Sequence, residues 1–194
     1  MKKITLAMFA LIGLVFSAKA QIQKGNVLIG ADLADFRLGL DQPTSFSMSL
    51  APKAAWFIQD NVALGAYGNL GISTVKGNGT STTYGIGALG RYYGGAASAP
   101  EVLKHTRFFG EANVGLNGVD LPADGGSTNG LGFGVGPGIA YFITPSIGLE
   151  TLLKYNGIVG FGSSAYAHNV SLNFGFQVYL PGRSTANKVR NDVR

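Results

Sequence analysis

The stretch Asn169-Val-Ser-Leu-Asn-Phe-Gly-Phe-Gln-Val-Tyr-Leu180 alternates strictly between apolar residues and polar or small ones. One face carries Val, Leu, Phe, Phe, Val and Leu, and the other carries Asn, Ser, Asn, Gly, Gln and Tyr. A period of two residues predicts a β-strand with one apolar face. Strands average about 5–6 residues, whereas a tilted strand needs about 9–11 residues to cross a bilayer. The length of this stretch therefore raises the question of whether its apolar face meets a protein core or lipid.

The N-terminal residues have the composition of a secretory signal peptide. Lys2 and Lys3 precede an apolar run from Ile4 to Phe16, and the small residues Ser17-Ala18-Lys19-Ala20 follow it. This order predicts export with cleavage after Ala20, and the apolar run is too short to serve well as a membrane anchor. The chain has no cysteine, so neither a lipid-modified cysteine nor a disulfide framework is available. We expect residues 1–20 to be a cleaved signal peptide, residues 21–180 to form one domain, and residues 181–194 to be a basic, disordered tail.

Charge and composition exclude a nucleic-acid-binding protein. The formal net charge is +5, but it falls to +2 without Lys2, Lys3 and Lys19 of the signal peptide. The tail alone carries +3, which leaves −1 for residues 21–180. A nucleic-acid-binding domain concentrates basic residues on a folded face, so we expect no nucleic-acid partner. Glycine accounts for 30 of the 194 residues and charged residues for only 13%. Together with export, this composition indicates an all-β protein of the cell envelope.

Eight alternating segments are separated by residues typical of turns. They span about residues 26–33, 44–57, 61–73, 81–93, 105–117, 130–143, 147–156 and 169–180. The apolar faces of these segments carry no charged residue, whereas the opposite faces carry three acidic and three basic residues. These six residues are Asp32, Lys53, Arg91, Glu111, Glu150 and Lys154. Because a charge on the lipid side of a barrel costs about 2–4 kcal/mol at the midplane, this pattern predicts apolar faces in lipid and charges in the interior.

The apolar faces end in aromatic residues, as expected at the two membrane–water interfaces. One rim has Trp56, Tyr92, Phe108 and Tyr141, and the other has Phe46, Tyr84 and Tyr155. The links after the second and sixth segments are tight turns, and those after the first, third, fifth and seventh are longer and polar. Short periplasmic turns and long outer loops have this order. The predicted fold class is an all-β, eight-stranded, antiparallel, up-and-down transmembrane β-barrel with both termini periplasmic.

The chain resembles the small eight-stranded outer-membrane barrels of the OmpX and OmpA-transmembrane-domain type, also called the outer membrane protein β-barrel domain or porin family. The resemblance covers about residues 26–180 and rests on pattern, except in the last segment. There, Asn173, Gly175, Val178 and Leu180 match the barrel-assembly signal, although the family usually ends with an aromatic residue and fourteen residues follow Leu180 here. The resemblance implies location in the cell outer membrane, a monomer, and lipid and the barrel-assembly machinery as partners.

The interior of an eight-stranded barrel is just wide enough for side chains to fill it. We therefore expect a side-chain-filled interior in which the six charged residues pair as a structural network, because an unpaired buried charge is strongly disfavoured. A narrow ion path through this network is the alternative. Four glycines, Gly132, Gly134, Gly136 and Gly138, would face inward and leave room for long side chains from other strands, or less plausibly form a ligand slot.

The sequence offers little support for catalysis or metal binding. His105 and His168 fall near opposite rims and are badly placed to share a metal. His168 with Ser163 or Ser164 would suit a lipid-modifying barrel enzyme, but no acid is placed to orient the histidine. We therefore expect no catalytic residue, no cofactor and no metal site.

Two further interpretations are less favoured. Asp120 and Asp124 are too few carboxylates for a dedicated calcium site. A soluble periplasmic barrel would need its apolar faces inside and all six charges outside. The favoured hypothesis is a non-enzymatic integral outer-membrane barrel that contributes to envelope integrity or to surface interactions through its outer loops, with an unknown surface ligand.

Overall fold

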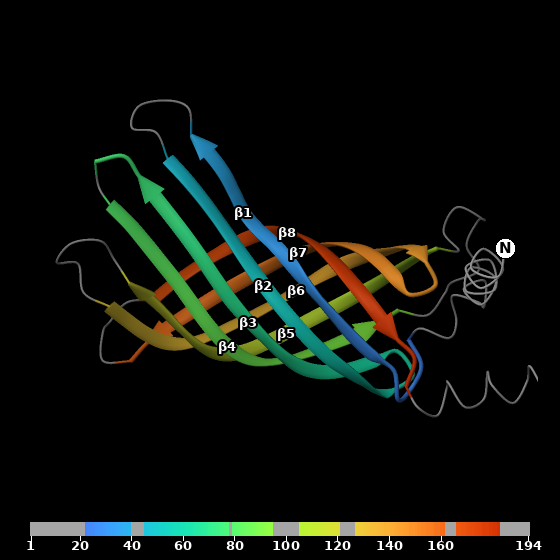
Figure 1. Ribbon diagram of the computed structural model, residues 1–194. Helices are drawn as coiled ribbons and strands as arrows, with labels where there is room; N and C mark the ends of the chain where they lie inside the picture. Colours follow the sequence, from blue (N-terminus) through green and yellow to red (C-terminus); the bar gives the residue numbers. More distant parts are fainter. Residues whose placement is uncertain are drawn as a thin grey trace, which may run out of the picture.

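The structure, a computed structural model, describes residues 22–39, 45–77, 79–94, 105–120, 127–161 and 166–182. The predicted signal peptide and residues 183–194 of the tail lie outside these residues. Eight strands pair antiparallel with their sequence neighbours, and β8 pairs with β1 to close a barrel (Figure 1). They are β1 Val27–Gly39, β2 Ser45–Gln59, β3 Val62–Val75, β4 Gly79–Tyr93, β5 Thr106–Asp120, β6 Ser127–Thr144, β7 Ile147–Gly160 and β8 Tyr166–Leu180. The predicted all-β, up-and-down barrel is confirmed. The described residues include no helix long and apolar enough to cross a bilayer.

The outer surface of the barrel is apolar, and β8 shows how the sequence produces it. Val170 and Phe174 are 64% and 58% exposed, whereas Ser171 and Asn173 between them are 8% and 7% exposed. The period of two thus sends the apolar side chains outward and the polar ones inward. Among the described strand side chains, the only exposed charge is Asp120, at the last position of β5. This distribution is the reverse of that in a soluble protein, because the apolar side chains lie outside and the charged side chains lie inside.

The two ends of the barrel differ, and we call them the turn end and the loop end. The turn end carries the tight β2–β3 and β6–β7 turns, where Asn61 has a φ of 67° and residues 145–146 join the strands. Both ends of the described chain also lie here, because Asn61 N donates to Ile22 O at 2.8 Å and Gly182 N donates to Asn26 Oδ1 at 3.0 Å. The loop end is the opposite end, reached by the last residues of β1, β3, β5 and β7.

The β3–β4 connection corrects one prediction. Its composition predicted a longer polar loop over residues 74–81, yet β3 continues to Val75 and Val75 pairs directly with Gly79 of β4. Gly77 and Gly79 have φ values of 91° and 90°. Residues with side chains rarely adopt this left-handed conformation, so the glycines permit a hairpin turn where a long loop was expected.

Several strands extend past their predicted boundaries at the loop end. β6 begins at Ser127, three residues earlier than predicted, and β7 ends at Gly160, four residues later. The added residues of β6 are Ser, Thr and Asn, which do not alternate in polarity. Because residues 127–129 do not alternate, the period of two cannot mark them as strand.

At the turn end the interior is filled by aromatic side chains, which we call the aromatic layer. It consists of the buried residues Phe57, Tyr93, Phe109, Phe142 and Tyr179. The ring centroids of Phe142 and Tyr179 are 5.0 Å apart and those of Tyr93 and Phe109 are 5.6 Å apart, within the range of favourable aromatic pairs. Phe109 lies over Gly138, where an added Cβ would sit 2.3 Å from the ring. At this position the inward glycine of β6 leaves room for a large neighbour, as the sequence predicts.

Candidate functional site: the barrel interior

The six charged residues predicted to face inward lie together in the middle of the barrel. They come from β1, β2, β4, β5 and β7, and we call them the charge network. All six side chains form ion pairs. Five of these side chains are at most 4% exposed, and that of Lys154 is 12% exposed. Their side chains meet because each of these five strands places them on its inward face.

Arg91 is the centre of the charge network. Its Nη2 donates to Glu111 Oε2 at 2.7 Å, and its Nη1 donates to both carboxylate oxygens of Glu150 at 2.8 Å. The guanidinium carbon also lies 4.1 Å from the ring centroid of Phe109, so the cation contacts the aromatic layer. The planar, multidentate guanidinium can bridge two carboxylates in this way, whereas a lysine ammonium offers only a point charge.

The other two cations complete the compensation of the carboxylates. Lys53 Nζ donates to Asp32 Oδ2 at 2.5 Å and to Glu111 Oε2 at 3.0 Å. Lys154 Nζ donates to Glu111 Oε1 at 3.1 Å, and Gln177 Nε2 donates to Asp32 Oδ1 at 2.8 Å. Every carboxylate of the network therefore has at least two donors, the condition under which buried charge is tolerated.

Two tyrosines join the charge network to the aromatic layer. Arg91 Nη1 donates to Tyr93 Oη at 2.9 Å, and Tyr179 Oη donates to Glu150 Oε1 at 2.7 Å. The two hydroxyls are 2.8 Å apart. Because the single proton of Tyr179 is directed to Glu150, Tyr93 is the donor in the tyrosine pair. The sequence pattern places both tyrosines on inward faces, but it did not predict that they would bind the charge network.

Arg107 corrects the predicted charge balance of the interior. This residue of β5 is 9% exposed, and its Nη1 donates to the backbone oxygen of Thr106 at 3.1 Å. The prediction counted three inward charges of each sign, but the described interior holds four basic residues. Arg107 and Glu111 are separated by four residues and share one face of β5, so the period of two was enough to predict that Arg107 faces inward.

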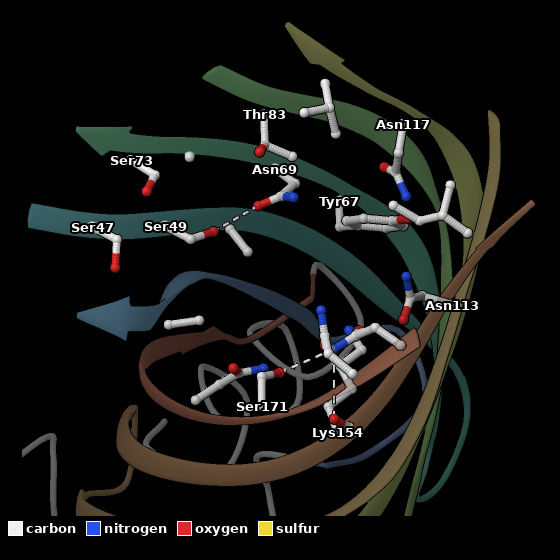
Figure 2. A pocket seen from close by; sticks show the side chains of 18 of the residues that line it. Ser47, Ser49, Tyr67, Asn69, Ser73, Thr83, Asn113, Asn117, Lys154 and Ser171 are labelled. Atoms are coloured by element: carbon white, nitrogen blue, oxygen red, sulfur yellow. Dashed lines mark hydrogen bonds between the residues drawn. The ribbon is translucent and has the colours of Figure 1, made fainter. Parts of the chain in front are cut away.

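The loop-end half of the interior is hollow. A cavity of about 510 Å³ lies there, and Figure 2 shows it from close by. Its amide lining residues are Asn69, Asn113, Asn117, Asn156, Asn169 and Asn173, and its hydroxyl lining residues are Ser47, Ser49, Ser73, Thr83 and Ser171. Tyr67 and Lys154 also line it. The expected side-chain-filled interior therefore holds for the middle and the turn end but not here, since these short side chains do not meet across the barrel.

The wall of this cavity is only partly hydrogen-bonded to itself. Ser49 Oγ donates to Asn69 Oδ1 at 2.9 Å, and Asn156 Nδ2 donates to Ser171 Oγ at 3.0 Å (Figure 2). Four buried polar atoms of the lining have no hydrogen-bond partner of standard geometry among the described residues. They are Tyr67 Oη, Asn113 Oδ1, Asn117 Oδ1 and Asn173 Oδ1. Unsatisfied buried polar atoms are rare in folded proteins, so each of them calls for a partner.

The aromatic residues predicted for the interfaces all point outward. Trp56, Tyr92, Phe108 and Tyr141 are exposed on the turn-end half of the barrel, and Phe46, Tyr84 and Tyr155 are exposed on its loop-end half. Phe174 and Phe176 of β8 are further aromatic residues exposed on the outer surface. Contact of these rings with lipid headgroups stays a prediction.

The residues of the predicted assembly signal occupy both faces of β8. Asn173 lines the cavity, and Gly175 faces Asp32, whose Oδ1 would be 2.4 Å from an added Cβ. Leu180 faces outward and pairs with Val27 of β1 at the closing seam. Val178 pairs with Ile29 across the same seam. The packing of these residues is clear, and their recognition during assembly stays a prediction.

The remaining candidates do not form a site among the described residues. His105 lies beside Tyr141 at the turn end, and His168 lies beside Tyr155 on the other half, with ring centroids 6.5 and 6.0 Å apart. The described part of the chain holds no group of three or more His, Cys, Asp or Glu side chains arranged for a metal. Ser163, Ser164 and Asp124 lie outside the described residues.

Comparisons with known proteins identify the fold. No protein-family model and no curated protein matches the sequence. Neisserial surface protein A (NspA) is similar in structure, with a TM-score of 0.50 and 20% identity over 80% of this chain and 96% of that one. Outer membrane protein H (OprH) of P. aeruginosa has a TM-score of 0.56 and 12% identity over 80% of this chain and 99% of that one. The chain therefore has the fold of the small eight-stranded outer-membrane barrels.

Proposed function

We propose that the protein is a non-enzymatic integral outer-membrane barrel that supports envelope integrity or mediates contacts at the cell surface. The observation that carries this proposal is the inverted distribution of side chains. Outward residues such as Ile86, Phe108 and Val170 are 59–69% exposed, and exposing such a continuous apolar belt to water would be very unfavourable. In a bilayer the same belt would contact lipid tails favourably, and the barrel wall would separate the charge network from the lipid.

Cell fractionation tests the location. The protein should be recovered with the outer membrane and should migrate as a heat-modifiable band, because a closed barrel resists detergent until it is boiled. Recovery from the soluble periplasm would contradict the proposal.

The orientation follows from the same proposal, with the turn end in the periplasm and the loop end outside. The chain has no cysteine, so single cysteines report their location without background. Lys76→Cys in the β3–β4 turn should react with a membrane-impermeant maleimide in intact cells. Asp60→Cys in the β2–β3 turn should react only after the outer membrane is permeabilised. The reverse labelling pattern would overturn the orientation.

The barrel is proposed to be non-conducting. Tyr93, Phe57 and Tyr179 are at most 2% exposed in the aromatic layer, and the charge network lies directly against it. A hydrated ion would have to displace both layers. Planar-bilayer recordings of the purified barrel should show no discrete conductance steps, and reproducible steps would favour the narrow pore instead.

The two proposed roles can be separated genetically. A deletion strain should become more sensitive to detergent if the role is envelope integrity. Complementation with a barrel in which residues 121–126 are replaced by a neutral linker should then restore resistance fully. Failure of this variant to complement, with normal membrane insertion, would favour a surface interaction through that segment.

A further inference from the structure

The loop-end cavity has the size of a small-molecule site, and its lining is rich in amides and hydroxyls. Its volume of about 510 Å³ lies within the range of about 300–1,000 Å³ typical of ligand pockets. The polar groups in Figure 2 come from six or more different strands and converge on one space. The cavity reaches the loop end, where the lining residues Ser73 and Asn169 are exposed.

The wall of the cavity carries almost no free charge. Lys154 is the single charged residue of the lining, and its Nζ already donates to Glu111 Oε1 at 3.1 Å. Behind it, the three carboxylates of the charge network are matched by Arg91, Lys53 and Lys154. A strongly anionic or cationic ligand would meet no complementary charge here, so the lining suits an uncharged ligand.

The unpartnered groups specify what that ligand must offer. Asn173 and Tyr67 are 7% and 8% exposed and line the cavity. Asn173 Oδ1 has no partner among the described residues, and Tyr67 Oη lies beside the amides of Asn113 and Asn117 without a hydrogen bond of standard geometry. Asn113 Oδ1 and Asn117 Oδ1 likewise make no hydrogen bond of standard geometry among the described residues. Amide oxygens only accept hydrogen bonds, so a fitting ligand carries several hydrogen-bond donors, and the hydroxyls of the lining can pair with its acceptors.

Tyr67 adds an aromatic surface at the inner end of the cavity. Its side chain lies against Gly87 and Gly115, where added Cβ atoms would be 2.7 and 2.8 Å from its atoms. The two glycines let the ring lie along the wall of β4 and β5, beside Asn113 and Asn117 (Figure 2). Such a ring can pack against the C–H face of a sugar while its hydroxyl bonds to the sugar hydroxyls.

We propose that the loop-end cavity is a binding site for a small neutral saccharide, recognised by its asparagine amides and by Tyr67. Hydroxyl groups both donate and accept, so a saccharide matches this lining of amides and hydroxyls. The proposal concerns the folded barrel alone, so its failure would leave the proposed outer-membrane role untouched.

NMR titration of the isotope-labelled barrel in phosphocholine micelles, free of sugar-headed detergent, tests the proposal. Glucose and trehalose should cause saturable shifts of asparagine side-chain amide signals with millimolar dissociation constants, and glucuronate and glucosamine should bind more weakly. The absence of saturable shifts with both neutral sugars at 0.5 M would mean that the cavity holds water only and would overturn the proposal. Tighter binding of glucuronate would overturn the assignment to a neutral ligand.

Two conservative variants locate the binding. Tyr67→Phe and Asn117→Leu should each weaken trehalose binding about three- to tenfold, the value of one net hydrogen bond. Tyr92→Phe is the matched control, since this tyrosine is 60% exposed on the outer surface, and it should leave the dissociation constant unchanged. Equal losses in Tyr67→Phe and Tyr92→Phe would contradict the site. A parallel titration with dextran distinguishes two sources of the saccharide. Binding of dextran indicates the end of a polysaccharide, and binding of trehalose alone indicates a free saccharide.

Discussion

Arg91 and Glu111 are direct cross-strand partners in the middle of the barrel, and Arg91 Nη2 lies 2.7 Å from Glu111 Oε2. Both side chains are 1% exposed. The pair is the point at which β4 and β5 are joined by charge as well as by backbone hydrogen bonds. Since Arg91 also holds Glu150, one guanidinium fixes two carboxylates on strands that are not neighbours.

Removing this guanidinium should strongly destabilise the barrel. Arg91→Met keeps much of the volume but leaves Glu111 and Glu150 with fewer donors in a buried setting. Breaking a buried pair on one side costs about 3–5 kcal/mol, so we expect a loss of that size in the free energy of unfolding, measured by urea denaturation in lipid vesicles. Lys76→Met, at an exposed turn position, should change it by less than about 0.5 kcal/mol. Equal small effects of the two substitutions would show that the network adds no stability.

Two tyrosine hydroxyls of the interior should respond in opposite ways to deletion. Tyr179→Phe removes a donor to the carboxylate of Glu150 and should lower the free energy of unfolding by about 1.5–3 kcal/mol. Tyr67→Phe removes a buried hydroxyl that makes no hydrogen bond of standard geometry among the described residues and should be neutral or slightly stabilising in the absence of ligand. Urea denaturation of both variants under one condition checks the contrast. A large destabilisation by Tyr67→Phe would reveal a partner for its hydroxyl, such as an ordered water.

An arginine on the outer surface should be costly only within the apolar belt. Leu153 lies near the middle of β7 and is 49% exposed. If lipid surrounds it, Leu153→Arg should cost about 2–4 kcal/mol. Thr82→Arg is the control, because Thr82 is an outward residue near the loop end that pairs with Asp120 of β5, and we expect a change within about 0.5 kcal/mol. If Leu153→Arg were as harmless as the control, water rather than lipid would surround the belt.

The last strand should contribute differently to assembly in cells and to folding in vitro. Leu180→Ser changes an outward side chain at the end of β8 and should cost less than about 1.5 kcal/mol in purified lipid vesicles. If Leu180 belongs to the assembly signal, the same substitution should reduce the heat-modifiable fraction in cells several-fold. Leu149→Ser, an outward leucine of β7 with similar exposure, controls for lost apolar area. Equal yields of the two variants in cells would argue against a signal at Leu180.

The period of two in the sequence was sufficient to predict the fold and the contents of each face. Every strand must hide its charges from lipid, so Asp32, Lys53, Arg91, Glu111, Glu150 and Lys154 could be assigned to the interior from their phase alone. The same rule also applied to Arg107, which was overlooked although its phase placed it inside. The residues added to the start of β6, from Ser127, do not alternate in polarity, so the rule could not mark them and the boundary was predicted too short.

What the sequence by itself determined is therefore which side chains point inward, because the contrast between lipid and barrel interior acts on each residue separately. Only the tertiary structure decided which of them meet and which space they leave open. Arg91 reaches Glu150 because closure brings β4 and β7 within side-chain reach across the barrel. Tyr67 lies flat because Gly87 and Gly115 stand beside it on two other strands. The cavity above them exists because short amides and hydroxyls from many strands face one another, a sum over the whole barrel that no single strand encodes.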